Sequence, residues 1–132
     1  MSLSASMEDY LEAIIEIGRE HPAVRVRDVA KRLGVKMPSV TGALKNLESK
    51  GFIRHERYDY IELTDMGIDL AKSIVARHKV ILAFLTEIIG VDRETAESEA
   101  CGIEHIISAG TMEKLTEYIE RTVSPVPGGM IK

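Results

Sequence analysis

The sequence has little cysteine and no long hydrophobic run. Among its 132 residues Cys101 is the only cysteine. One thiol cannot form an internal disulfide, so we expect the protein to function in a reducing compartment. No apolar run approaches the roughly 18 residues that a membrane helix needs, and the N-terminal MSLSAS lacks the apolar core of a signal peptide. The sequence therefore predicts a cytoplasmic protein without a membrane partner.

A strong positive charge is missing as well. The formal net charge is −4 at pH 7, which does not by itself favour a nucleic-acid partner. The charge is unevenly distributed, however, because residues 19–57 are rich in Arg and Lys whereas residues 87–120 are strongly acidic. This asymmetry predicts two halves with different tasks.

Helical periodicity dominates what is present. Ser6 and Asp9 have capping-box spacing, and an apolar stripe at helical spacing follows them. Two short β-rich pieces, residues 52–55 and 60–63, flank a polar turn and predict a hairpin. We therefore expect a mainly α fold. The predicted helices lie within residues 6–21, 25–35, 36–52, 64–89, 91–108 and 109–123. Thr64 is expected to cap the fourth of them, whose apolar stripe runs to Ile89, and Gly90 is expected to end it.

Residues 26–45 match the helix-turn-helix pattern. Ala30 allows close helix contact, Gly34 makes the turn and Val40 packs back. The second helix of such a unit lies in the major groove of DNA, and the basic hairpin that follows completes a winged helix. We expect this half to bind double-stranded DNA. The residues predicted to contact DNA are Arg27, Lys36, Pro38, Ser39, Thr41, Lys45, Arg54 and Arg57.

A plainer interpretation is an ordinary three-helix core with solvated basic residues. Turn, hairpin and local positive charge together favour DNA binding instead. Gly42 offers no side chain to a base, so phosphate contacts and DNA shape are expected to supply much of the affinity.

Potential metal ligands occur in three places along the chain. If the helices that carry them pack together, these side chains can meet in one pocket. Carboxylates and imidazoles suit a divalent transition metal, and a thiolate shifts the preference from hard manganese towards softer ions. The candidates are Asp9 and Glu12 on the first helix, His78 in the apolar stripe of the long helix, and Cys101, Glu104 and His105 on one face of the fifth.

Each of these residues has a plainer interpretation when taken alone. A histidine in an apolar stripe is more often a hydrogen-bonded core residue. A cytosolic cysteine is usually a small buried hydrophobe, and acids in a first helical turn are favoured by the helix dipole. Only the combination favours a metal site.

Several longer motifs span nearly the whole chain: SMEDYLEAI, PSVT, LTxxG, RH at 77 and 78, IIGVD and EACGIEH. In these motifs the sequence resembles the metal-dependent repressors typified by the diphtheria toxin repressor and the manganese transport regulator. The resemblance implies a winged helix-turn-helix domain at residues 1–63 and an all-helical metal-binding and dimerisation domain at 64–132. It also implies a homodimer on a palindromic operator. The implied primary metal ligands are Asp9, Glu12, His78, Cys101, Glu104 and His105.

The sequence also departs from both branches of that family. Manganese-type members have Asp and Glu at the positions of residues 9 and 12, as here, but Glu in place of Cys101; iron-type members have the cysteine but Met in place of Asp9. The expected cofactor is therefore Mn²⁺ or Fe²⁺. The iron-type ancillary site is weakened, because Leu82 replaces a carboxylate and Glu97 a histidine. The length matches the short branch without an SH3-like domain.

The resulting hypothesis is a metal-responsive repressor of metal-homeostasis genes that Mn²⁺ or Fe²⁺ activates for operator binding. We expect no enzyme and no small organic substrate, because the chain lacks an H-E-x-x-H-like signature and any feature suggesting a substrate pocket. The main alternative is a single-cysteine, redox-sensing winged-helix repressor, which needs a partly exposed Cys101 with a depressed pKa. A constitutive dimeric DNA-binding protein is the third possibility.

Overall fold

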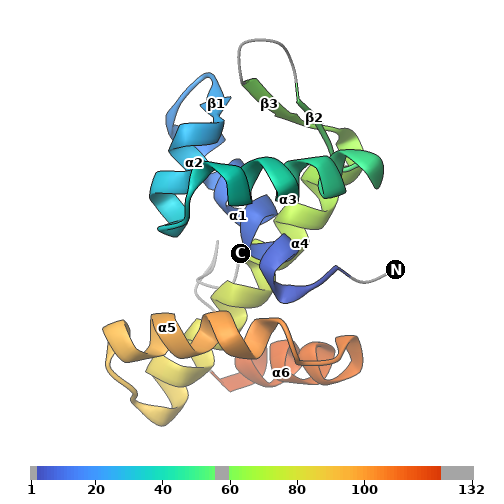
Figure 1. The fold of residues 1–132 in the computed structure, drawn as a ribbon. Helices are drawn as coiled ribbons and strands as arrows, with labels where there is room; N and C mark the ends of the chain where they lie inside the picture. The colour runs from blue at the N-terminus through green and yellow to red at the C-terminus, as the bar shows by residue number, and fades with distance from the viewer. Residues whose placement is uncertain (1–2, 56–59, 123–132) are drawn as a thin grey trace. The chain divides into compact units, whose positions relative to one another are not determined.

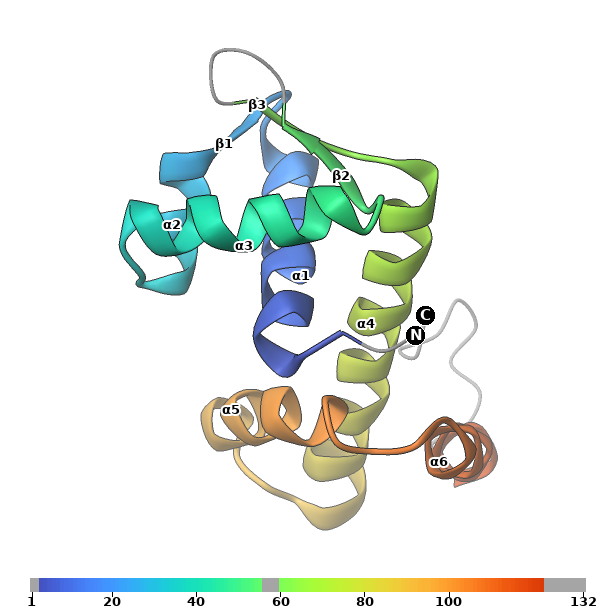
Figure 2. The same ribbon diagram turned by 45° about the vertical axis from the view of Figure 1, so that its right-hand side comes forward.

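Helices and short strands alternate along the residues that the structure, a computed structural model, describes: 3–55 and 60–122 (Figures 1 and 2). The chain divides into two compact units, Met1–Ser73 and Ile74–Lys132. In chain order the elements are α1 (Ala5–Glu20), β1 (Val24–Arg25), α2 (Val26–Leu33), α3 (Met37–Ser49), β2 (Ile53–His55), β3 (Tyr60–Leu63), α4 (Asp65–Ala83), the π-helix η2 (Phe84–Ile89), α5 (Arg93–Glu104) and α6 (Ala109–Thr122).

Helix α1 begins earlier than the sequence predicted. The amide of Met7 donates a hydrogen bond to Oγ of Ser4, which is therefore the N-cap. The predicted cap at Ser6 is wrong, because Ser6 already lies inside the helix and the Ser4 hydroxyl has taken the first-turn amide. The predicted apolar stripe is confirmed, since Leu11, Ile14 and Ile17 are buried.

Helices α2 and α3 form the predicted helix-turn-helix. Gly34 has φ +69° and ends α2 in the left-handed conformation, and the amide of Val35 bonds to the carbonyl of Ala30. Ala30 of α2 and Val40 of α3 are both buried, and the two helices pack against each other. Helix α1 packs against α2 and α3, so the three helices share one core.

A small antiparallel sheet completes the N-terminal unit. Its strand order is β1-β3-β2, and β2 with β3 forms the predicted hairpin. Strand β1 was not predicted, because it is only two residues long and exists by pairing Val24 with Ile61. The guanidinium of Arg25 donates to the Tyr60 hydroxyl at 3.1 Å and stacks on the Tyr60 ring. These contacts hold β1 against β3.

The start of α4 is fastened to the hairpin. Thr64 caps the helix as predicted, since its Oγ accepts the Gly67 amide at 3.0 Å, while its hydroxyl donates to the carbonyl of Gly51 at 2.6 Å. A Cβ at Gly67 would lie 1.9 Å from the carbonyl oxygen of Phe52. Only glycine therefore allows α4 to approach this backbone so closely.

The C-terminal unit has its own hydrophobic core. It contains the end of α4, η2, α5 and α6. Ala96 and Ala100 of α5 are fully buried, as is Ile119 of α6. The buried members of this core are Val80, Ile81, Leu82, Ala83, Leu85, Ala96, Ala100, Met112 and Ile119.

None of the helices in the described part of the chain is long and apolar enough to cross a membrane.

The long helix changes its geometry near its end. The sequence predicted one continuous stripe to Ile89, but the α-helix stops at Ala83 and η2 follows with π geometry. The wider π turn shifts the helical register, so Leu85 stays buried whereas Ile89 is 56% exposed. The expectation for Ile89 was therefore wrong. The predicted stop at Gly90 is confirmed by its φ of +82°.

Gly67→Ala should destabilise the protein by about 1–3 kcal/mol, because the added methyl must displace the Phe52 carbonyl. The midpoint of urea unfolding measures the effect. Gly110→Ala is a matched control in the first turn of α6, where an added Cβ meets nothing within 4 Å. Equal midpoints for the two variants would contradict this account of α4 packing.

Candidate DNA-binding surface and metal centre

The first turns of α3 present the predicted recognition residues to solvent. Lys36, Pro38, Ser39 and Lys45 are exposed, on the side away from the buried Val40. Thr41 is half-buried and its hydroxyl donates to the carbonyl of its own helix at Met37, 3.1 Å away. Its methyl group is therefore the part of Thr41 best able to contact a base.

The remaining predicted DNA contacts lie on α2 and on the wing. Arg27 is exposed on α2, and Arg54 is exposed on β2. The guanidinium of Arg54 pairs with the Glu62 carboxylate across the hairpin at 3.1 Å, so a phosphate would compete with Glu62 for it. Arg57 lies outside the described residues.

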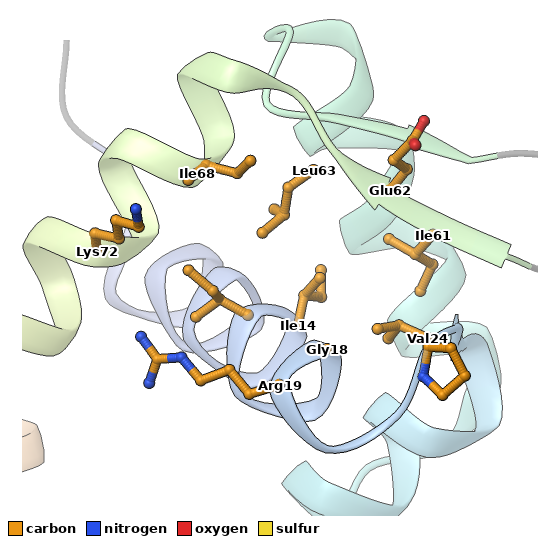
Figure 3. Close-up of a pocket in the computed structure, with 11 residues that line it drawn as sticks. Ile14, Gly18, Arg19, Val24, Ile61, Glu62, Leu63, Ile68 and Lys72 are labelled. Carbon is orange, nitrogen blue, oxygen red and sulfur yellow. The ribbon is translucent and has the colours of Figure 1, made fainter.

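A cavity of about 490 Å³ lies elsewhere in the N-terminal unit (Figure 3). Its walls come from α1, β3 and the start of α4, and Ile14, Leu63 and Ile68 line it with apolar surface. Arg19 and Lys72 are among its polar lining groups. None of the predicted metal ligands or DNA-binding residues that the structure describes lines this cavity.

Helix α5 positions half of the predicted metal ligands. Asp92 caps it by accepting the Thr95 amide at 3.0 Å, and the helix then carries Cys101 and Glu104 before ending at His105. The i, i+3, i+4 spacing places these three side chains on one face, as predicted. One ligand atom of Cys101 and one of His105 lie within 4.8 Å of each other.

Glu104 is the buried acid of this group. Its side chain is fully buried, and Oε1 lies 2.6 Å from Nδ1 of His78 on α4. Among the described residues Oε2 has no hydrogen-bond partner, and Nε2 of His105 is 3.9 Å from it. A buried carboxylate oxygen left without a hydrogen bond is costly. A cation at Oε2 would remove that cost, so these donors fit a metal ion.

Glu97 was not predicted to belong to this group. Its Oε1 lies 2.8 Å from Nε2 of His78, and its Oε2 lies 3.5 Å from the Arg93 guanidinium. The hydrogen bond with His78 is the main cause of a lowered pKa at Glu97. The sequence did contain a signal, because Glu97, Cys101 and Glu104 follow one another at i, i+4 and i+7.

The other two predicted ligands belong to the N-terminal unit. Asp9 and Glu12 are three residues apart on α1, so both lie on one side of that helix. Both are half-buried. The structure thus gathers His78, Cys101 and the acids and imidazole of α5 within one unit, while Asp9 and Glu12 lie in the other.

A winged helix-turn-helix joined to a helical unit rich in metal donors defines the class of metal-responsive DNA-binding proteins. Residues 2–61 match the family model described as iron dependent repressor, N-terminal DNA binding domain. Residues 64–125 match iron dependent repressor, metal binding and dimerisation domain. The chain therefore belongs to the iron-dependent repressor family. It is a metal-dependent, dimerising transcriptional regulator and not an enzyme.

Individual relatives agree with this assignment. An HTH-type transcriptional regulator of Methanocaldococcus jannaschii is 39% identical over 120 residues, covering 90% of this chain and 96% of the relative. The HTH-type transcriptional regulator MntR of Bacillus subtilis is 35% identical over 115 residues, covering 87% and 80%. The structure of the manganese regulator SloR is 26% identical, with a TM-score of 0.78 over 91% of this chain. The chain spans 55% of the SloR chain.

The Asp92 cap should stabilise α5 in a pH-dependent manner. Hydrogen bonds from Thr95 lower the pKa of Asp92, so its contribution is present above about pH 4 and is lost as the pH falls through the lowered pKa. Asp92→Asn keeps a capping oxygen without the charge. In urea unfolding, its deficit relative to wild type should shrink between neutral pH and about pH 3. A deficit that does not change with pH would rule out the charge as its cause.

Proposed function

We propose that this protein is a Mn²⁺- or Fe²⁺-activated repressor that binds a palindromic operator as a homodimer and controls metal-homeostasis genes. The observation that carries the proposal is the buried Glu104 carboxylate, with imidazoles on both sides and one oxygen that accepts no hydrogen bond among the described residues. Such an oxygen is suited to a cation. The proposed metal ligands are Asp9, Glu12, His78, Cys101, Glu104 and His105.

The donor types support both candidate metals. The carboxylates suit Mn²⁺, and the imidazoles with the Cys101 thiolate suit Fe²⁺ and softer ions. The family is described by iron dependence, whereas SloR is described as a manganese regulator. When bound, the metal would supply positive charge that holds carboxylates of α1 and α5 in one site, where they would otherwise repel each other.

That link makes the metal a switch for DNA binding. Helix α1 packs against both helices of the helix-turn-helix, so fixing α1 also fixes α3, the helix proposed to enter the major groove. In a dimer, two such helices must reach successive major grooves about 34 Å apart. A coupling of about 1–3 kcal/mol changes operator affinity about 5- to 150-fold, and DNA must tighten metal binding equally.

The proposed DNA contacts divide into two kinds. Lys36, Lys45 and the wing arginines would bind phosphates, while Pro38, Ser39 and Thr41 would lie nearer the base edges.

The functional boundary between the DNA-binding and the metal-binding domain is placed between residues 63 and 64. Because it acts on operator DNA and its single cysteine needs no oxidising compartment, we place the protein in the cytoplasm.

A titration tests the proposed function directly. Duplex DNA selected from a random pool in the presence of Mn²⁺ is titrated with protein and Mn²⁺, Fe²⁺, Co²⁺ or Zn²⁺, with Fe²⁺ kept anaerobic. Affinity should rise about 5- to 150-fold with the activating ion and fall when a chelator is added. Metal-independent binding would instead identify a constitutive DNA-binding protein. Thiol-dependent binding in metal-free protein would identify the redox-sensing alternative, for which the half-buried Cys101 is accessible.

Cys101→Ala should weaken the binding of thiophilic ions such as Zn²⁺ more than that of Mn²⁺, because it removes the soft donor and leaves the carboxylates. Competition with a metal-binding dye measures both affinities on the metal-free protein. Cys101→Ser is the control that preserves side-chain size. Equal losses for the two metals would mean that Cys101 is not a ligand.

Lys45→Ala should weaken binding to all DNA sequences alike and reduce the slope of log affinity against log salt by about 1, because it removes one phosphate contact. Fluorescence anisotropy at several salt concentrations gives the slope. Lys114→Ala on α6 removes an exposed charge from the C-terminal unit and serves as the matched control. The same slope in Lys45→Ala and wild type would remove Lys45 from the interface.

A further inference from the structure

The imidazole of His78 is held by a carboxylate at each ring nitrogen. Nδ1 lies 2.6 Å from Oε1 of Glu104, and Nε2 lies 2.8 Å from Oε1 of Glu97. The two acids come from one helix, α5, seven residues apart, and His78 comes from α4. Together they fix both the plane of the ring and the edge that it turns towards Glu104.

We propose that Glu97 is the positioning residue of the metal site: its carboxylate accepts a hydrogen bond from Nε2–H of His78, so that the lone pair on Nδ1 can bind the ion. The inference rests on the proposed metal site and adds to it a residue that is not itself a ligand. Histidines that bind metals commonly donate their other ring N–H to a carboxylate, which fixes the ring and raises its basicity.

The ring nitrogen that carries the lone pair decides whether His78 and Glu104 can bind the same ion. A neutral imidazole has one N–H and one lone pair. With the proton on Nε2, the lone pair lies on Nδ1, the nitrogen beside Glu104. With the proton on Nδ1, the lone pair would face Glu97, and the ring could not share an ion with Glu104. Glu97 therefore favours the tautomer with the proton on Nε2, in which Nδ1 can bind the ion.

The contacts and the solvent exposure of Glu97 differ from those of the proposed ligand Glu104. Glu97 contacts the ring nitrogen opposite the one that faces Glu104, and its second oxygen pairs with the Arg93 guanidinium at 3.5 Å. The Glu97 side chain is 46% exposed, whereas the Glu104 side chain is fully buried. Both oxygens of Glu97 thus have partners, whereas Oε2 of Glu104 accepts no hydrogen bond among the described residues.

Two substitutions of Glu97 test the proposal in the full-length protein. Glu97→Leu keeps a bulky side chain but removes the acceptor, and it should weaken Co²⁺ binding about 10- to 100-fold. Glu97→Gln keeps an oxygen that can accept a hydrogen bond from Nε2–H and should recover most of the affinity. Co²⁺ is titrated into metal-free protein without oxygen, and the visible absorption of the bound ion is recorded.

Two further variants separate positioning from general effects on α5. Arg93→Ala removes the other ion pair of Glu97 but leaves its contact with His78, and Glu94→Leu removes an exposed acid of the same helix. Both should bind Co²⁺ as wild type does. A loss in Glu94→Leu equal to that in Glu97→Leu would reduce the role of Glu97 to surface charge and overturn the proposal.

The nitrogen that binds the metal can be observed directly. With diamagnetic Zn²⁺ bound, ¹⁵N NMR of the His78 ring should show a protonated Nε2 and a metal-bound Nδ1 in wild type and Glu97→Gln. Glu97→Leu should show both coordination modes. Equal Co²⁺ affinity and unchanged His78 shifts in Glu97→Leu would overturn this inference alone. A wild-type protein that binds neither ion would overturn the proposed function as well.

Discussion

The contact between Glu104 and His78 is the interaction on which the chemistry of the C-terminal unit depends. A carboxylate removed from water costs several kcal/mol unless partners compensate it, and Glu104 is 1% exposed. Nδ1 of His78 lies 2.6 Å from one of its oxygens, while the other oxygen accepts no hydrogen bond among the described residues. The C-terminal unit thus buries an acid with one oxygen that a bound cation would satisfy.

Local periodicity was sufficient to predict the elements and the faces of the helices. The Gly34 turn, the Thr64 cap and the common face of Cys101, Glu104 and His105 all follow from spacing within a few residues. Features that require a distant partner were missed. Strand β1 exists through pairing with β3, and Glu97 joins the site through a histidine 19 residues away. The π geometry of η2 also departs from the regular helical spacing on which the prediction of the long helix rested.

Helix α1 carries residues proposed for both tasks of the protein. Its buried side chains Leu11, Ile14 and Ile17 form the core on which α2 and α3 rest. The ion pairs of Arg32 with Glu16 and Glu20 join α2 to the same helix. These pairs are partly exposed to solvent and contribute little free energy, so the apolar contacts are the main attachment of α2 and α3 to α1. Because α1 also carries Asp9 and Glu12, a metal that fixes those acids would act on the recognition helix through one packed core.

The strength of such a switch and its choice of metal depend on different properties of the ligands. When it binds a metal, a cysteine thiolate brings the same single negative charge as a glutamate carboxylate, so Cys101 as a ligand would leave the charge around the bound ion unchanged. Only the softness of the donor changes, and softness governs the preference among transition metals. A ligand set that combined Cys101 with Asp9 would therefore change the preferred metal without changing the charge of the occupied site.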